Sequence, residues 1–338
     1  VLDEDVWENP FLKGLRERAR IHIADQGDGN HFAFVGEVEV APEQIVQLQN
    51  AGYESVANHL SGTPGQSRRY RVLVTHHGSR GLGAHLYKRG QVAATKQTGR
   101  IADRIPNAGV WLDASSPEGR DYWEALQYTA RWTKANHEAI HARFLERIGG
   151  EAVTQFGNEH NFVWKRGDVF LHGKGATPAW KDSEGRPLLG LIPLNMAEPI
   201  LMVLGADNSE FLSFAPHGAG RNLSRTALKR KYPGPESKLR AIEDSTRGID
   251  VRWFCGGPDL SETPVAYKNA AQVRAQIEQF GLADVVAEIQ PLGCIMAGDT
   301  GPALWKKRKE EELTPKQKRQ LQHRAERRRI KQQLDYEW

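Results

Sequence analysis

Four histidines lie in short segments rich in glycine or polar residues, a setting that presents an imidazole to a ligand. They are His31 in Gly-Asp-Gly-Asn-His-Phe, His76 in His-His-Gly-Ser-Arg-Gly, His160 in His-Asn, and His217 in Pro-His-Gly-Ala-Gly-Arg. One such histidine is most often a structural group. Four of them, beside glycines that permit close backbone approach and Arg or Asn side chains that bind anions, indicate a shared chemical site.

Neutral imidazole has two uses that suit such a site. It is a ligand for borderline divalent metals, and it is a nucleophile that attacks phosphorus. A metal beside the attacking ring would spread the charge that develops on a phosphate, and Arg or Lys would complete the neutralisation. These residues alone therefore indicate metal-assisted phosphoryl or nucleotidyl transfer, and they leave the substrate open.

Two loops supply candidate phosphate ligands. The segment Gly-Ala-Gly at 218–220 precedes Arg221, and Arg225 follows, so amide and guanidinium groups are available to a phosphate. Lys174 lies between two glycines, which suits a polyphosphate or an RNA end. This loop is not a Walker P-loop, because the Gly-Lys-Ser/Thr order and its four-residue spacer are absent.

The histidines adjoin predicted elements of both kinds. Strand-like alternation at 32–40 follows His31, and a short apolar strand at 71–75 runs into His76. Residues 161–171 predict a hairpin that turns at 166–168, and 270–280 predicts a helix ending at Gly281. Mixed α and β elements without an internal repeat indicate one catalytic body over residues 1–298.

A long helix is predicted from Ser116, as N-cap, to a stop at Gly149-Gly150. Its apolar positions recur at spacings close to those of one helical face; they include Tyr122, Leu126, Ala130, Ile140 and Phe144.

The composition is that of a folded protein, and the length suits an enzyme. Of the 338 residues, 39% are hydrophobic and 26% are charged, which is unlike the composition of a disordered chain. Two cysteines, Cys255 and Cys294, exclude a disulfide framework and predict a reducing compartment, the cytoplasm. The most apolar window, 188–206, contains two prolines, an asparagine and a glutamate, so no membrane span is expected there. Cys294 is also predicted as a buried apolar residue of the last strand.

The excess positive charge lies in the C-terminal segment. Residues 299–338 hold 12 basic and 7 acidic residues, whereas the body holds 34 and 35. We expect a basic tail, helical or disordered, with basic runs at 306–309 and 324–331. It is either a solvated charged end or a contact to RNA phosphates or a ribonucleoprotein.

The motifs resemble those of the RtcB-type RNA ligase family in content and order. They are Asp-Gly-Asn-His-Phe at 28–32, His-His-Gly-Ser-Arg-Gly-Leu-Gly at 76–83, His-Asn at 160–161, Gly-Lys-Gly-Ala-Thr-Pro-Ala at 173–179, Pro-His-Gly-Ala-Gly-Arg-Asn-Leu-Ser-Arg at 216–225 and Glu-Thr-Pro-Val-Ala-Tyr-Lys at 262–268. The resemblance covers roughly residues 20–298. It implies an α+β (mixed α/β) fold, a single large RtcB-like catalytic domain followed by the basic tail.

The resemblance implies a metal-dependent RNA ligase of RNA repair or tRNA splicing. The family joins RNA ending in a 2′,3′-cyclic phosphate or 3′-phosphate to RNA with a 5′-hydroxyl, using GTP and manganese. By this resemblance His217 forms a phosphoramidate with GMP; the guanylyl group passes to the RNA 3′-phosphate, and the 5′-hydroxyl then displaces GMP. The matching metal ligands are His31, His76 and His160. The matching nucleotide-binding positions are Asn30, Asn161, Pro193, Asn195, Met196, Gly218, Ala219, Gly220 and Tyr267, and the substrate phosphates are expected near Arg80, Lys174, Arg221 and Arg225.

Two departures from the family pattern concern the metal and the base. The family takes two further metal ligands from an upstream Asp-x-x-Cys, and residues 1–20 contain no Cys. Either the chain lacks a natural N-terminal part, which the Val at position 1 favours, or the two-metal site is depleted and binds one metal weakly. Phe34 occupies the position of a glutamate that pairs with guanine, and Met296-Ala297 aligns with a terminal Lys-Gly.

A third departure is at 193–196, where Pro-Leu-Asn-Met replaces Pro-Gly-Ser-Met, with Ile200 in place of a later serine. These changes predict weaker selection of GTP. Three functions remain open at this point: a metal-dependent RNA ligase, a related end-processing or nucleotidyl-transfer enzyme that keeps His217, and a non-catalytic RNA-binding descendant.

Overall fold

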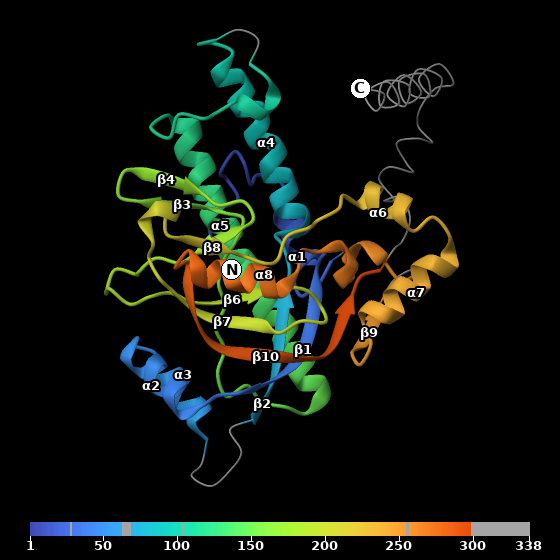
Figure 1. The fold of residues 1–338 in the computed structure, drawn as a ribbon. Helices are drawn as coiled ribbons and strands as arrows, with labels where there is room; N and C mark the ends of the chain where they lie inside the picture. Colours follow the sequence, from blue (N-terminus) through green and yellow to red (C-terminus); the bar gives the residue numbers. More distant parts are fainter. Residues whose placement is uncertain (28, 63–68, 103–104, 255–256, 299–338) are drawn as a thin grey trace.

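The computed structural model describes residues 1–27, 29–62, 69–102, 105–254 and 257–298 (Figure 1). Within them, a six-stranded sheet has the order β2-β1-β10-β7-β6, and β9 pairs with β10. Its strands are β1 (Phe32–Glu39), β2 (Arg69–His76), β6 (Leu189–Pro193), β7 (Ile200–Gly205), β9 (Asp250–Trp253) and β10 (Ala283–Met296). All pairings in this sheet are antiparallel except β9 with β10.

Helices and two small two-stranded sheets complete the fold. The α-helices are α1 (Arg16–Ile21), α2 (Pro42–Asn50), α3 (Glu54–Ser61), α4 (Arg80–Thr98), α5 (Pro117–Ile148), α6 (Arg225–Lys231), α7 (Pro235–Ser245) and α8 (Ala270–Gln279). The small sheets pair β3 (Val163–Arg166) with β4 (Val169–His172) and β5 (Ala176–Pro178) with β8 (Phe214–Pro216). The expected α+β class is confirmed, as are the strands after His31 and before His76, the hairpin and the helix before Gly281.

Strand β7 is buried on both faces, and its side chains alternate between two hydrophobic cores. Ile200, Met202 and Leu204 pack into the core shared with α2 and α3. Leu201 and Val203 point the other way and pack against α8. Successive side chains of a strand alternate between faces, so an unbroken apolar run of this kind has a layer on each side.

Strand β1 runs between β2 and β10 and carries the residues after His31 into the centre of the sheet. Phe32 is paired with His76 of β2 and with Met296 of β10, and Phe34 is paired with Cys294. Cys294 is buried, as expected. The register of β1 therefore places the first histidine motif beside the second one and beside the end of the last strand.

Helix α5 has the predicted limits, but a different set of residues is buried. The Ser116 side chain accepts a hydrogen bond from the Gly119 amide, and Gly149 ends the helix in the left-handed conformation, φ 65°. The buried residues are Gly119, Ala125, Tyr128, Thr129, Trp132 and Asn136. The predicted positions, Tyr122, Leu126, Ala130, Ile140 and Phe144, are only partly buried. The N-terminal segment and α4 pack over Tyr128 and Trp132, and sequence spacing does not reveal which turn a distant segment covers.

The predicted tail at 299–338 and Cys255 lie outside the described residues. Among the helices that the structure describes, none combines the length and apolarity needed to cross a bilayer.

The Trp132 side chain is fully buried between α5, α4 and the N-terminal segment. Replacing it, Trp132→Ala, is expected to lower the free energy of unfolding by about 3–5 kcal/mol, because the substitution leaves a large cavity. Trp111→Ala is the control, since Trp111 is 44% exposed; it should change stability by about 0.5 kcal/mol or less. Urea denaturation of both variants measures the difference, and equal losses would contradict the packing described for α5.

Candidate active site

A cavity of about 340 Å³ gathers most of the residues singled out from the sequence. Those in its wall are Asn30, His76, Asn161, Lys174, Pro193, Asn195, Met196, His217, Gly218, Ala219, Gly220, Arg221, Arg225 and Tyr267. His31, His160 and Arg80 do not line it. The residues of the wall come from the loop before β1, the end of β2, the loops before β3 and after β4, the end of β6 and the turn that follows it, the segment from β8 into α6, and position 267. The pocket therefore depends on the register of the central sheet.

The four motif histidines form a row of packed rings. The centroids of His31 and His76 are 5.8 Å apart and those of His76 and His160 are 4.8 Å apart. His217 continues the row, with its ring 4.7 Å from that of His160 at an interplanar angle of 15°. The predicted convergence of these four histidines is confirmed, and His217 lies beside the histidines expected to hold a metal.

Burial favours the neutral form of three of these imidazoles, those of His76, His160 and His217. It lowers the pKa of His160 to about 4, helped by the neighbouring His217, and lowers that of His76 well below its usual value. The pKa of His217 is lowered by burial and then by the Lys174 ammonium group. Two protonated rings 4.7 Å apart would also repel by about 3–4 kcal/mol at an effective dielectric constant of 20. A neutral ring can act as a ligand or as a nucleophile.

A loop made of residues 173–175 holds His217 in place. The Asn161 side-chain oxygen accepts a hydrogen bond from the Gly175 amide at 2.6 Å. The Gly175 carbonyl in turn accepts one from the His217 amide at 3.3 Å. Lys174 is exposed to the pocket between these contacts. One of the predicted nucleotide contacts, Asn161, therefore also fixes the loop that carries the lysine.

Arg221 and Arg225 are organised by a buried carboxylate that the sequence analysis did not single out. Glu262 is 2% exposed; one of its oxygens accepts hydrogen bonds from both arginines, and the other accepts from the Tyr267 hydroxyl at 2.8 Å. Burial raises the pKa of Tyr267, so the phenol remains a donor. Glu262 is the first residue of the 262–268 motif, and this position in the motif is the feature of the sequence that could have identified it.

Arg221 is left with donors that nothing in the described chain satisfies. Its guanidinium lies over the Tyr267 ring, 5.5 Å from the centroid, and bonds Glu262 through Nη1. Its Nε and Nη2 atoms are buried without a hydrogen-bond partner among the described residues. Buried N–H groups of a guanidinium require an acceptor, and a phosphate matches their geometry. The position of Arg221 in the pocket wall thus fits its predicted role.

The model of the family described as tRNA-splicing ligase RtcB matches residues 8–297. The chain belongs to the RtcB family. It is 28% identical to the tRNA-splicing ligase RtcB of Thermococcus kodakarensis, over 82% of this chain and 60% of that protein. It is 26% identical to the protein of the same name from Archaeoglobus fulgidus, over 83% and 61%, and 28% identical to the RNA-splicing ligase RtcB of Mycobacterium tuberculosis, over 82% and 66%. The chain thus spans less than two thirds of the length of these RtcB relatives.

The donors expected to hold a metal in this RtcB chain are of a suitable kind but do not form a complete set. No group of three or more His, Cys, Asp or Glu residues converges on one point within the described part of the chain. The His76 and His160 rings face each other with an interplanar angle of 21°. His31 Nδ1 lies 2.9 Å from the Gln26 carbonyl oxygen, to which it donates as the Nδ1–H tautomer, and this leaves its Nε2 as the basic nitrogen. These three imidazoles do not, by themselves, make a metal site.

Arg80 is hydrogen-bonded to a carboxylate of the chain itself. It begins α4 with a positive φ of 50°, and its Nε donates to Asp25 at 3.1 Å. The Asp25 backbone is in turn bonded to the buried Asn136 of α5. Arg80 lies outside the pocket wall, and through Asp25 it links the start of α4 to the segment before His31 and to α5. Its expected role as a phosphate ligand stays a prediction.

A second group of imidazoles adjoins His31 and was not predicted from the sequence. The rings of His77 and His137 are 4.7 Å apart, and the Thr75 hydroxyl contacts His137 Nδ1 at 2.9 Å and His141 Nε2 at 2.7 Å. Burial, followed by neighbouring imidazoles, lowers the pKa of His77 to about 3 and that of His137 to about 4. His77 adjoins His31 at 6.2 Å, so the two groups form one row of packed rings.

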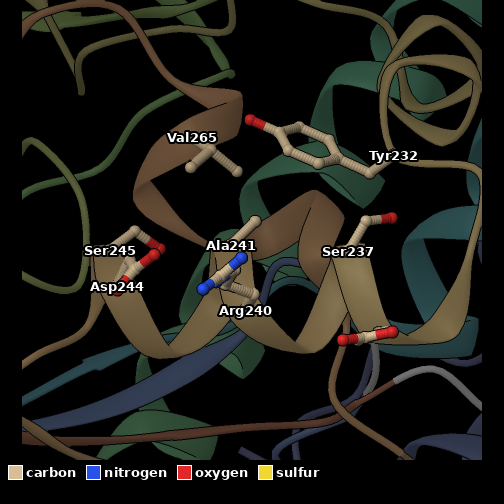
Figure 2. Close-up of a pocket in the computed structure, with 8 residues that line it drawn as sticks. Tyr232, Ser237, Arg240, Ala241, Asp244, Ser245 and Val265 are labelled. Carbon is tan, nitrogen blue, oxygen red and sulfur yellow. The ribbon is translucent and has the colours of Figure 1, made fainter.

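A second hollow, of about 620 Å³, lies along α7 (Figure 2). Figure 2 shows the Tyr232 ring on one side of it and Arg240, Asp244 and Ser245 along the helix. None of the residues predicted from the motifs lines this hollow, so the chemistry of the described residues is concentrated in the histidine-lined pocket.

Removing the charge of Glu262, by Glu262→Gln, is expected to destabilise the protein by about 2 kcal/mol, because it leaves guanidinium donors of Arg221 and Arg225 without their ionic acceptor. Glu236→Gln makes the same change at an exposed position of α7 and should be close to neutral. Thermal denaturation of the two variants gives the comparison. If Glu262→Gln is as stable as Glu236→Gln, the carboxylate does not organise the arginines.

The neutral buried imidazoles predict acid-sensitive folding. Because the folded pKa values of His77 and His137 lie below the unfolded value near 6.5, the unfolded chain binds more protons below that pH. The contribution of these two histidines to the free energy of unfolding is therefore complete above pH 6.5, and it is lost as the pH falls toward 4. His137→Gln should reduce the loss between pH 7.5 and 4.5 by about 2–3 kcal/mol.

Urea denaturation with a chelator present, repeated at each pH, measures this loss. His59→Gln alters an exposed histidine and serves as the control. Identical pH profiles for His137→Gln and the unmodified protein would show that His137 is not held neutral by the fold.

Proposed function

We propose that this chain is an RNA ligase that joins a 3′-phosphate or 2′,3′-cyclic phosphate RNA end to a 5′-hydroxyl end through a nucleotidyl-histidine intermediate. The observation that carries the proposal is a His217 with a lowered pKa in one pocket with Lys174 and with Arg221, two of whose buried nitrogens lack a partner among the described residues. Membership of the RtcB family and the names of its relatives support the same reaction class.

The proposed first step is attack of a His217 ring nitrogen on the α-phosphorus of a nucleoside triphosphate. A P–N bond forms, the P–O bond to the β-phosphate breaks, and pyrophosphate leaves. Lys174 and Arg221 are the cations placed to neutralise the phosphates. Stacking of the His217 ring on His160 fixes the orientation of the His217 ring, which keeps its nitrogen in the direction of attack.

In the next steps the nucleotidyl group passes to the RNA. An oxygen of the RNA 3′-phosphate attacks the same phosphorus and breaks the P–N bond, which frees His217. The 5′-hydroxyl of the second RNA then attacks the 3′-phosphorus, loses its proton and displaces the nucleoside monophosphate. A cyclic phosphate must first be opened by water to a 3′-phosphate. The basic tail at 299–338 is proposed, from its charge alone, to contact RNA phosphates or a ribonucleoprotein.

A divalent cation such as manganese is part of the proposal because neutral imidazole is its ligand type, and His31, His76 and His160 are the residues that would contribute. When bound, it would stabilise charge on the reacting phosphates. Since the three rings are not a complete ligand set, no step above depends on it. The incomplete set also favours a second candidate, a nucleotidyl-transfer or end-processing enzyme that labels His217 but does not seal RNA.

His217→Ala is expected to abolish acid-labile labelling of the protein by an α-³²P nucleoside triphosphate in the presence of manganese, because the attacking nitrogen is removed. His172→Ala, at an exposed position of β4, is the matched control and should label as the unmodified protein does. Undiminished labelling of His217→Ala would contradict the assignment. Incubation with a 3′-phosphate and 5′-hydroxyl RNA pair then separates a ligase, which gives joined product, from the second candidate.

A further inference from the structure

The part of the pocket wall that comes from β1, β10 and residues 194–200 is apolar except for Asn195. Its apolar side chains are Phe34, Leu194, Met196, Ile200, Cys294 and Met296, none more than 5% exposed. The cross-strand pairs of Phe32 with Met296 and Phe34 with Cys294 bring the strands' residues together. Burial raises the pKa of Cys294 to about 12, so its thiol presents no negative charge here.

We infer that this apolar wall receives the nucleobase, and that the enzyme accepts adenine nucleotides at least as well as guanine nucleotides. The inference rests on the proposed nucleotidyl transfer to His217. The negatively charged triphosphate is expected to bind beside Lys174, His217 and Arg221, which are polar residues of the wall. The flat apolar faces of a purine suit the remaining part, where aromatic and thioether side chains provide contact area.

Guanine presents N1–H and an exocyclic NH₂ group on one edge, and both need acceptors when buried. Glu262 is the single carboxylate among the described residues of the wall. Its oxygens already accept from Arg221, Arg225 and Tyr267. A guanine edge would therefore meet side chains without a free carboxylate.

The neighbouring amide does not replace the missing carboxylate. Asn195 Oδ1 accepts from the Ala197 amide at 3.0 Å, so the free group of this side chain is its donating NH₂. Such a donor suits a ring nitrogen of adenine, which accepts at N1, N3 and N7. Adenine also has fewer N–H groups to bury than guanine, so the wall penalises it less.

Competition binding of unlabelled ATP, GTP and ITP to the full chain tests the inference independently of catalysis. We expect a dissociation constant for ATP equal to or below that for GTP. We also expect ITP, which lacks the exocyclic amine of guanine, to bind more tightly than GTP. Tighter binding of GTP than of ATP by about 10-fold or more would overturn the inference, as would the absence of binding by all three.

The matched α-³²P nucleotides then test transfer. If ATP binds as expected but no nucleotide labels His217, the proposed function fails while the base preference stands. If GTP binds and labels preferentially, the proposed function stands and the inference fails.

A carboxylate introduced into the wall should reverse the preference. Phe34→Glu is expected to shift the ratio of the GTP and ATP dissociation constants toward GTP by about 10-fold, and Phe34→Leu, which keeps the wall apolar, should leave it unchanged. Phe34 is 1% exposed, so folding of Phe34→Glu is checked by thermal denaturation. Met296→Gln adds a neutral acceptor on the neighbouring strand and should shift the ratio in the same direction. Unchanged ratios in the folded variants would contradict the assignment of this wall to the base.

Discussion

The structure depends on a row of imidazoles that are packed too closely to be charged together. His217, His160, His76 and His31 follow one another at ring spacings of 4.7–5.8 Å, and the row continues into His77 and His137. Burial and neighbouring charges lower the pKa values of His217, His160, His76, His77 and His137, which favours the neutral state that a nucleophile or a metal ligand requires. The same neutral state makes folding sensitive to acid, so the chemistry and the stability of the protein share one physical cause.

The central sheet creates this arrangement by register. Strand β1 places Phe32 between His76 and Met296, and this single alignment sets both the histidine row and the apolar wall of the pocket. The phosphate side is built differently, from loops held by polar contacts. There, the Glu262 carboxylate, buried at 2% exposure, accepts hydrogen bonds from two arginines, and two nitrogens of Arg221 have no partner among the described residues.

Much of this was accessible from the sequence because the signals are local. Alternation located β1, Ser116 and Gly149 marked the ends of α5, and the glycine-flanked histidines marked the site. The features that could not be predicted from the sequence depend on contacts between distant segments. The pairing of Arg80 with Asp25, 55 residues away in the chain, is one example. Glu262 carried no sign of burial, and His77 and His137 belong to one cluster only because β2 meets α5. The buried side of α5 was equally hidden, since the N-terminal segment decides it.

The most direct test of the account is to locate the nucleotide on the protein. After incubation with a nucleoside triphosphate and manganese, the protein is digested at neutral or alkaline pH and the modified peptide is sequenced by mass spectrometry. The account predicts a nucleoside monophosphate joined to His217. A monophosphate joined to Lys174 or His76, the other nitrogen nucleophiles among the described side chains of the pocket wall, or to no residue, would contradict it.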